Sequence, residues 1–159
     1  MKVGLLTSTS KRHSYFIKML AQKLKPEIII CEDKPEFSKN KLIESENKIF
    51  VDVHHSEKSK KIKKGMINSD KTFNILKDSC VKICFVFGTS LIKKNILENL
   101  DCVFINIHTG LTQHYRGVDS TLWAIYNNDL GNIGYTIHQI DKGIDTGNIL
   151  IQGRTVIDI

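Results

Sequence analysis

The sequence has 159 residues, of which 41% are hydrophobic and 25% are charged, and its formal net charge is +6. A domain of this length buries about 70% of the surface that its unfolded chain exposes, so we expect one domain with a real core over residues 1–159. The composition excludes a disordered chain, and no apolar run approaches the roughly 20 residues of a membrane helix. Residues 1–14 lack the pattern of a signal peptide, so we expect a cytoplasmic protein.

The four cysteines, Cys31, Cys80, Cys84 and Cys102, form no CxxC pair. We therefore expect buried reduced thiols, with neither a zinc site nor a disulfide framework. Lysines gather at residues 57–65. A solvated surface is the simpler interpretation of this segment, and a phosphate or nucleic-acid contact is the alternative. Few aromatic residues lie near it, which argues against an RNA-binding platform.

The first part of the chain has the pattern of a strand, a helix and a strand. "KVGLLT" at residues 2–7 and "EIIIC" at residues 27–31 are short apolar runs, and "YFIKMLAQKL" at residues 15–24 has apolar residues at helical spacing. A βαβ unit in one sheet places its two strands in parallel. The polar stretch at residues 32–68 predicts a second helix with a connection.

The middle of the chain repeats this alternation. We predict a helix over residues 71–80, a strand buried on both faces over residues 82–88 and a helix over residues 90–100, whose apolar stripe has helical period. The next strand is "CVFINIH" at residues 102–108.

The last part predicts a helix over residues 120–128 capped by Ser120, a half-buried strand over residues 134–140 and a final strand over residues 148–157. Alternating elements indicate an α/β fold: an open, mostly parallel, Rossmann-like sheet with helices on both faces. Ligands of such sheets bind outside the carboxyl ends of the strands. The first turn, residues 5–12, contains no glycine, so neither the dinucleotide fingerprint nor the P-loop is present.

Asn106 and His108 are the polar residues at the end of a strand that is otherwise apolar. Successive side chains of a strand point to opposite faces, so these two share one face, roughly 6.5–7 Å apart. An Asn amide is a neutral donor, and a His can take or give a proton near pH 7. Together they suit acyl transfer, in which Asn stabilises an oxyanion and His moves the proton. On spacing alone, a hydrogen-bonded structural pair is the more common case.

A carboxylate beside His108 would hold its orientation, and two candidates follow in "QIDKGIDTGNIL". We favour Asp145, because its "DTG" lies in a turn between two predicted strands that can bring it over the sheet edge. Asp141 precedes Lys142 and fits an ordinary turn acid.

Three motifs in order resemble the folate-dependent formyltransferases: "INIHTGLTQHYRG" at residues 105–117, "WAI" at 123–125 and "GYTIHQIDKGIDTGNILIQ" at 134–152. The resemblance runs from about residue 82 to residue 152. In that family the Asn, the His and the Asp of the DxG turn form the catalytic triad, which implies Asn106, His108 and Asp145 here.

The resemblance implies an enzyme that transfers a formyl group from 10-formyltetrahydrofolate to a primary amine, without a metal. Asn106 and His108 would stabilise the oxyanion, and His108, supported by Asp145, would pass a proton to the leaving folate nitrogen. The family holds the pterin largely through backbone groups. The matching cofactor-binding positions are Thr89, Ser90, Leu91, Ile92, Ile140, Asp141, Gly143 and Ile144.

The loop at residues 109–117 would cover the acceptor, with Tyr115, Arg116 and Gly117 as substrate contacts. Arg116 can bind phosphate or carboxylate bidentately, although a surface arginine fits the pattern equally. Arg12 lies at the end of the first strand, where it could contact a substrate phosphate.

The purine and tRNA enzymes usually have "SLLP" in this loop, whereas here "GLTQ" places Gln113 at the proline position. The segment is closer to the nucleotide-sugar N-formyltransferases, so we predict a nucleotide-linked amino sugar as the small-molecule acceptor. The alternatives are a glycinamide ribonucleotide or methionyl-tRNA formyltransferase-like activity, a non-catalytic folate-binding relative, and another α/β transferase whose Asn106 and His108 bind a carboxylate. Family members continue beyond the DxG strand, so we expect a catalytic domain whose C-terminal part is short or missing.

The remaining histidines have simpler interpretations. His54 and His55 fit exposed residues, because no further metal ligands follow at suitable spacing. His138 fits either a hydrogen-bonded structural residue or a partner of the site, and His114 fits the loop surface. Trp123 fits a core anchor of its helix.

Overall fold

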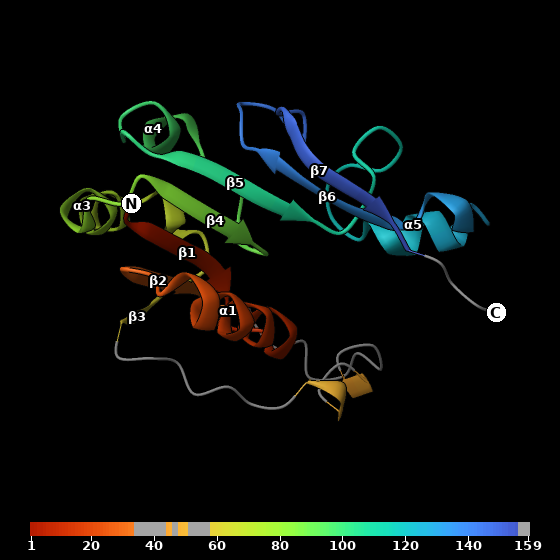
Figure 1. The fold of residues 1–159 in the computed structure, drawn as a ribbon, viewed down its shortest axis with the longest axis horizontal. Helices are drawn as coiled ribbons and strands as arrows, with labels where there is room; N and C mark the ends of the chain where they lie inside the picture. Colours follow the sequence, from red (N-terminus) through yellow and green to blue (C-terminus); the bar gives the residue numbers. More distant parts are fainter. Residues whose placement is uncertain (34–43, 46–47, 51–57, 156–159) are drawn as a thin grey trace. The chain divides into compact units, whose positions relative to one another are not determined.

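We describe a computed structural model in which residues 1–33, 44–45, 48–50 and 58–155 are placed. The chain divides into two compact units, Met1–Cys102 and Val103–Ile159 (Figure 1). The expected histidines at 54 and 55 and most of the helix expected within residues 32–68 lie outside the described residues.

The first unit contains strands β1 (Val3–Ser8), β2 (Ile28–Glu32), β3 (Ser59–Ile62) and β4 (Ile83–Phe87). β1 pairs in parallel with β2 and with β4, and β2 pairs in parallel with β3. The parallel pair of the first βαβ unit is therefore confirmed. β3 was not predicted, because its sequence "SKKI" is short and polar, and exposed lysines on it suit an edge strand.

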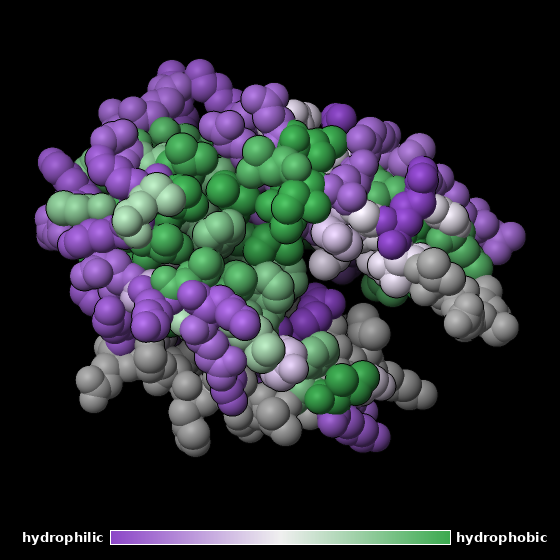
Figure 2. All heavy atoms as spheres, viewed as in Figure 1, coloured by the Kyte–Doolittle hydropathy of each residue, from purple (hydrophilic) through white to green (hydrophobic). Residues whose placement is uncertain are grey.

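Helix α1 (Lys11–Leu24) packs on one face of this sheet, where Ile17 joins Leu5, Ile29 and Cys31 in a buried cluster (Figure 1). Figure 2 shows apolar side chains gathered over β1 and β4. The alternate residues of the same strands point to the opposite face and are buried as well: Leu6, Ile28, Ile30, Cys84 and Val86. Both faces of the sheet are therefore covered, as an α/β fold requires.

Two further helices of this unit are α3 (Asp70–Ser79), which follows the short 3-10 helix η1 (Met66–Asn68), and α4 (Lys94–Leu97). The helix predicted over residues 90–100 is thus wrong at both ends, because only residues 94–97 are helical. The side chain of Asn68 donates to the Leu91 carbonyl at 2.9 Å and accepts from the Lys93 N–H at 2.7 Å. These bonds satisfy the backbone of residues 91–93 outside a helix, so the helix begins only after Lys93.

The second unit contains β5 (Val103–His108), α5 (Ser120–Tyr126), the 3-10 helix η2 (Leu130–Asn132), β6 (Gly134–Gln139) and β7 (Ile149–Arg154). β6 pairs antiparallel with both β5 and β7. Since the first unit is wholly parallel and both units alternate strands with helices, the predicted α/β class with a mostly parallel sheet is confirmed.

Three expectations about single residues are wrong. Ser120 does not cap α5, because the N-cap is Asp119 and Ser120 is already inside the helix. Trp123 is 55% exposed, because α5 buries only its narrow face around Ser120 and Ala124. Cys80 is exposed at the end of α3, whereas Cys31 and Cys84 are buried; all four cysteines lie in the described residues, and no disulfide joins any two of them.

Candidate active site

Strands β5 and β6 place four polar side chains on one face of the second unit. In the antiparallel register Asn106 lies opposite His138, and His108 lies opposite Thr136. Opposite residues of paired strands share a face, so the Asn and His of β5 face the same side as His138 of β6. The two-residue spacing of Asn106 and His108 therefore has the consequence that was predicted.

The turn between β6 and β7 brings Asp145 back over these strands. Gln139 donates its N–H to the Asn148 carbonyl at 2.9 Å and so closes the turn. A Cβ atom on Gly147 would lie 1.8 Å from the Gln139 carbonyl oxygen, which explains the glycine of "DTG". Asp145 itself has a φ of 52°, a left-handed conformation that Asp tolerates better than most residues.

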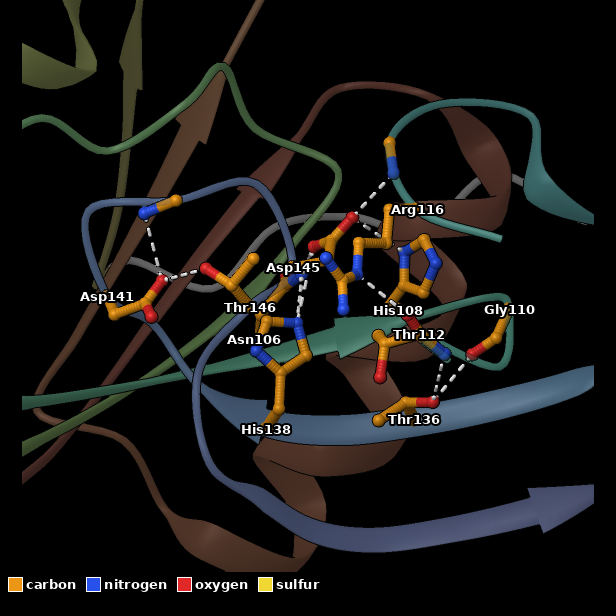
Figure 3. Close-up of polar contacts among 12 residues, drawn as sticks. Asn106, His108, Gly110, Thr112, Arg116, Thr136, His138, Asp141, Asp145 and Thr146 are labelled. Atoms are coloured by element: carbon orange, nitrogen blue, oxygen red, sulfur yellow. Dashed lines mark hydrogen bonds and ion pairs between the residues drawn. The ribbon is translucent and has the colours of Figure 1, made fainter. Parts of the chain in front are cut away.

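The Asp145 carboxylate is the centre of the site (Figure 3). Its Oδ1 accepts from Asn106 Nδ2 at 3.1 Å and lies 3.2 Å from His138 Nε2. Its Oδ2 accepts from the Gly117 N–H at 2.7 Å and lies 3.4 Å from His108 Nδ1. Burial alone raises the pKa of Asp145, but the hydrogen bonds from His138 and Gly117 and the charges of both histidines outweigh it and lower this pKa. Asp145 is therefore an anion that holds the other polar groups.

His108 is 6% exposed, and its contacts define its tautomer. Nε2 lies 2.9 Å from the Tyr115 carbonyl, which only accepts, so this nitrogen carries a hydrogen. Ser120 Oγ lies 3.1 Å from the same nitrogen and donates its own hydrogen to the Gly117 carbonyl, so it too accepts from Nε2. Nδ1 lies on the other side of the ring, 3.4 Å from Asp145 Oδ2, so the two ring nitrogens of His108 face different partners.

Gly110 allows this close packing around His108. A Cβ atom at Gly110 would lie 2.6 Å from the Cβ of Ser120 and 2.7 Å from His108 Nε2. Thr136 Oγ1 donates to the Gly110 carbonyl at 2.7 Å and accepts from the Thr112 N–H at 3.3 Å, which fixes the start of the loop on β6 (Figure 3).

His138 is 2% exposed and contacts both Asn106 and Asp145. Burial alone lowers the pKa of His138, whereas the hydrogen bonds to Asp145 and to the Gln139 carbonyl and the nearby carboxylates raise it; the net shift is upward. Two interpretations were predicted for His138, and its contacts match the one in which it is a partner of the site.

The expected substrate contacts Tyr115, Arg116 and Gly117 all lie in the loop that touches the triad. Arg116 is exposed, and its Nε donates to the Thr112 carbonyl at 2.7 Å, which orients the guanidinium. The Tyr115 hydroxyl donates to Asp129 Oδ2 at 2.9 Å, so this side chain anchors the loop, while the Gly117 N–H is used by Asp145. His114 is exposed, as predicted.

The expected cofactor positions fall into two groups. Ile140, Asp141, Gly143 and Ile144 lie in the turn after β6, in the same unit as the triad. Asp141 Oδ1 accepts from the Gly143 N–H at 3.0 Å and from Thr146 Oγ1 at 2.7 Å, which shapes this turn. Ile144 is 57% exposed.

The other group follows β4 in the first unit and consists of Thr89, Ser90, Leu91 and Ile92. Arg12 lies in the same unit, at the start of α1. The backbone of the group is held from inside the unit. Glu32, 3% exposed at the end of β2, accepts from the Ser90 N–H at 2.6 Å and from the Gly65 N–H at 2.8 Å. Asn68 also holds this segment, by donating to the Leu91 carbonyl and accepting from the Lys93 N–H.

Sequence reasoning did not assign a role to Ser120 at the site or to Glu32 in the first unit, and it left the role of His138 open. The contacts of all three depend on strand register and loop closure, which the sequence pattern does not contain. One signal was present: Thr136 and His138 alternate on one face of β6. Among the described residues, no group of three or more His, Cys, Asp and Glu side chains could hold a metal ion. Within the same ranges, no helix is long and apolar enough to span a bilayer.

The fold and this arrangement define an α/β protein with an Asn-His-Asp site, and comparison with known proteins gives its family. The sequence profile described as Formyl transferase matches residues 44–159. The chain belongs to this family.

Two relatives differ in how much of the chain they match. A methionyl-tRNA formyltransferase of Borreliella afzelii (strain PKo) is 30% identical over 153 residues, which are 96% of this chain and 47% of the relative. A GDP-perosamine N-formyltransferase of Brucella melitensis biotype 1 is 35% identical over 69 residues, which are 43% of this chain and 26% of the relative. The chain spans about half the length of the methionyl-tRNA formyltransferases that it matches.

Solved structures share the fold. A sugar N-formyltransferase from Shewanella sp FDAARGOS_354 has a TM-score of 0.65 at 22% identity, over 99% of this chain and 58% of that one. The phosphoribosylglycinamide formyltransferase from Streptococcus pneumoniae TIGR4 has a TM-score of 0.68 at 17% identity, over 100% of this chain and 86% of that one.

Proposed function

We propose that this protein transfers a formyl group from 10-formyltetrahydrofolate to a primary amine, most favourably the amino sugar of a nucleotide-sugar. The observation that carries the proposal is that the Asp145 carboxylate contacts both Asn106 Nδ2 and His108 Nδ1. We place the activity in the cytoplasm, where buried cysteines such as Cys31 and Cys84 stay reduced. Membership of the formyl transferase family supports the reaction class.

Each member of the triad has a role that follows from its chemistry. The Asn106 amide is a neutral donor, suited to the oxygen that gains negative charge when an amine adds to a formyl carbon. His108 carries a hydrogen on Nε2 and faces Asp145 through Nδ1, so it can hold a proton in the transition state and release it to a leaving nitrogen. Asp145 orients both groups and stabilises the protonated histidine.

The folate, when bound, supplies the formyl group. Each unit has one backbone segment whose chemistry suits a pterin ring. Residues 89–92 and 140–144 each offer amide and carbonyl groups, which match a neutral heterocycle of donors and acceptors. Both segments are held by buried or turn carboxylates, Glu32 in one case and Asp141 in the other. A preorganised backbone lowers the ordering cost of binding.

The loop after β5 supports a nucleotide-linked acceptor. Gln113 Oε1 accepts from Gln152 Nε2 at 2.6 Å, and that amide also donates to Thr136 Oγ1 at 2.8 Å. This pair fixes the loop without the proline found in the purine and tRNA enzymes. Arg116 in the same loop is exposed and suited to a phosphate. The relative that acts on GDP-perosamine, by its name, shares 35% identity over the 69 matched residues.

Methionyl-tRNA is the second candidate acceptor. The observation in its favour is the extent of the match, because the Borreliella afzelii enzyme aligns over 96% of this chain. The lysines of residues 58–64 are exposed, and their charge would suit a nucleic-acid backbone.

Tetrahydrofolate release tests both candidates. The full chain is supplied with 10-formyltetrahydrofolate and, in separate reactions, GDP-perosamine, methionyl-tRNA or glycinamide ribonucleotide. We expect release with the nucleotide-sugar, and loss of release in His108→Ala and Asp145→Asn. Release with methionyl-tRNA alone would favour the second candidate. Binding of an unreactive folate analogue without release with any amine would make the chain a binding relative, and no binding would contradict the cofactor.

A further inference from the structure

His138 has one ring nitrogen whose state is settled by its surroundings. Nδ1 lies 2.9 Å from the Gln139 carbonyl, and a carbonyl only accepts, so Nδ1 carries a hydrogen in every state of the ring. Protonation and deprotonation of His138 therefore occur at Nε2, which points at the triad (Figure 3).

Nε2 has two neighbours at the same distance with opposite requirements. Asn106 Nδ2 lies 3.2 Å away and only donates, whereas Asp145 Oδ1 lies 3.2 Å away and only accepts. A neutral ring offers a lone pair at Nε2 and accepts from Asn106. A protonated ring offers a hydrogen at Nε2 and donates to Asp145. The proton on His138 thus selects one partner.

The consequence for Asn106 follows from counting its amide hydrogens. Nδ2 has two, and one is donated to Asp145 Oδ1 at 3.1 Å. With neutral His138 the second is donated to the ring, and neither is left for a reacting oxygen. With protonated His138, the Nε2 hydrogen faces the amide and the second Asn106 hydrogen is released.

We propose that His138 is a positioning residue whose protonated form frees one amide hydrogen of Asn106 for the oxyanion. This inference presupposes the proposed formyl transfer. The groups that face His138 are Asp145 in contact, Asp141 through its charge, and His108, whose ring centroid is 6.5 Å away. Both carboxylates favour the protonated ring, and the pKa of His138 is raised accordingly.

The first test is an NMR titration of the full chain, which requires no activity. The side-chain amide of Asn106, assigned by its loss in Asn106→Ala, is followed with the ring signals of His138 and His108 over about pH 5 to 9. We expect the Asn106 amide to shift with the midpoint of His138 and to stop shifting in His138→Gln. His114→Gln, a change at an exposed histidine, should leave the Asn106 titration intact.

The second test separates a positioning role from a purely structural one by the pH profile. Gln places an N–H near the position of Nε2 at every pH, and Asp145, being charged, is the stronger acceptor for it. We therefore expect kcat of the wild type to fall as pH rises through the His138 midpoint, and kcat of His138→Gln to lose this decline. His138→Met has no donor, and its kcat should be about 10- to 100-fold lower throughout, less than the loss expected for a whole oxyanion donor.

An Asn106 amide that follows only His108, or that titrates unchanged in His138→Gln, would overturn the inference. Should the variant not fold, the wild-type midpoints alone decide, because His138 and His108 are followed separately. Absence of formyl transfer with every acceptor would overturn the proposed function instead, while the coupling between Asn106 and His138 would still be measured.

Discussion

Glu32 accepts a hydrogen bond from the backbone N–H of Ser90, with 2.6 Å between Oε2 and N, and its Oε1 accepts from Gly65 at 2.8 Å. Glu32→Gln turns one of these acceptors into a donor that faces an N–H. We expect a loss of about 1–3 kcal/mol in the free energy of unfolding. We also expect weaker binding of a folate analogue, because Ser90 belongs to the proposed cofactor segment. Urea unfolding and a binding titration measure the two effects. Glu27→Gln, at an exposed residue, is the matched control, and equal behaviour of the two variants would remove Glu32 from this role.

Asp145→Asn should reduce kcat strongly while leaving the fold intact. The amide keeps the shape of the carboxylate but loses the charge that stabilises protonated His108, and one of its atoms becomes a donor toward groups that donate already. We expect a decrease of about 10³-fold or more, in the range of other triad carboxylates. Asp78→Asn on the exposed side of α3 controls for the loss of one charge. A kcat close to that of the control would contradict the proposed role.

The stability of the protein should respond to acid through Asp145. The pKa of Asp145 is lowered in the folded state, so its contribution is fully present above the ordinary Asp value of about 3.9 and is lost as pH falls through the folded value. We expect the wild type to lose more free energy of unfolding than Asp145→Asn between about pH 5 and pH 3. Denaturant unfolding at a series of pH values measures this, and parallel curves would show that the carboxylate is not stabilised in the fold.

Ser120→Ala removes an oxygen that accepts from His108 Nε2 and donates to the Gly117 carbonyl. We expect a loss of about 1 kcal/mol in stability and a several-fold decrease in kcat/KM, because the loop at residues 115–117 loses one of its ties to His108. Thr121→Ala is the matched control, since its hydroxyl donates to the Thr109 carbonyl on the outer side of the same helix turn. Comparable kinetics in the two variants would show that Ser120 is a packing residue.

Gly110→Ala should damage the site by contact alone. The new methyl group would lie within 2.6 Å of Ser120 and 2.7 Å of His108, and backbone and helix would have to move apart. We expect a loss of about 1–3 kcal/mol in thermal or urea unfolding, together with reduced turnover. Gly131→Ala meets nothing within 4 Å and should behave as the wild type. An unaffected Gly110→Ala would show that the loop after β5 gives way freely.

Apart from the short polar strand β3, the order of the described strands and main helices could be predicted, because each depends on a local pattern. The strands at residues 83–87, 103–108 and 134–139 are short apolar or alternating runs. Where a distant side chain supplies the hydrogen bonds, the local pattern fails. The apolar stripe of residues 90–100 looks helical, yet Asn68 satisfies the backbone at residues 91–93. Ser120 has the sequence position of a cap, yet its hydroxyl is used by His108.

The site divides in the same way. Asn106 and His108 could be brought together from their spacing alone, and the turn position of "DTG" favoured Asp145 as their carboxylate before the family motif agreed with it. His138 could not be given a partner, because its contact with Asn106 depends on the β5–β6 register. Glu32 ends an ordinary buried strand, and its role depends on two loops that the sequence does not bring together.

The exposed position of Trp123 gives the protein an optical reporter of its own. It is the only tryptophan in the sequence, it stands 55% exposed on α5, and its ring lies edge-on to Tyr126 at a centroid distance of 5.8 Å. The same short helix begins at Ser120, which holds His108. Emission excited selectively from this indole therefore comes from the helix beside the triad, so ligand titrations and stopped-flow measurements need no added label.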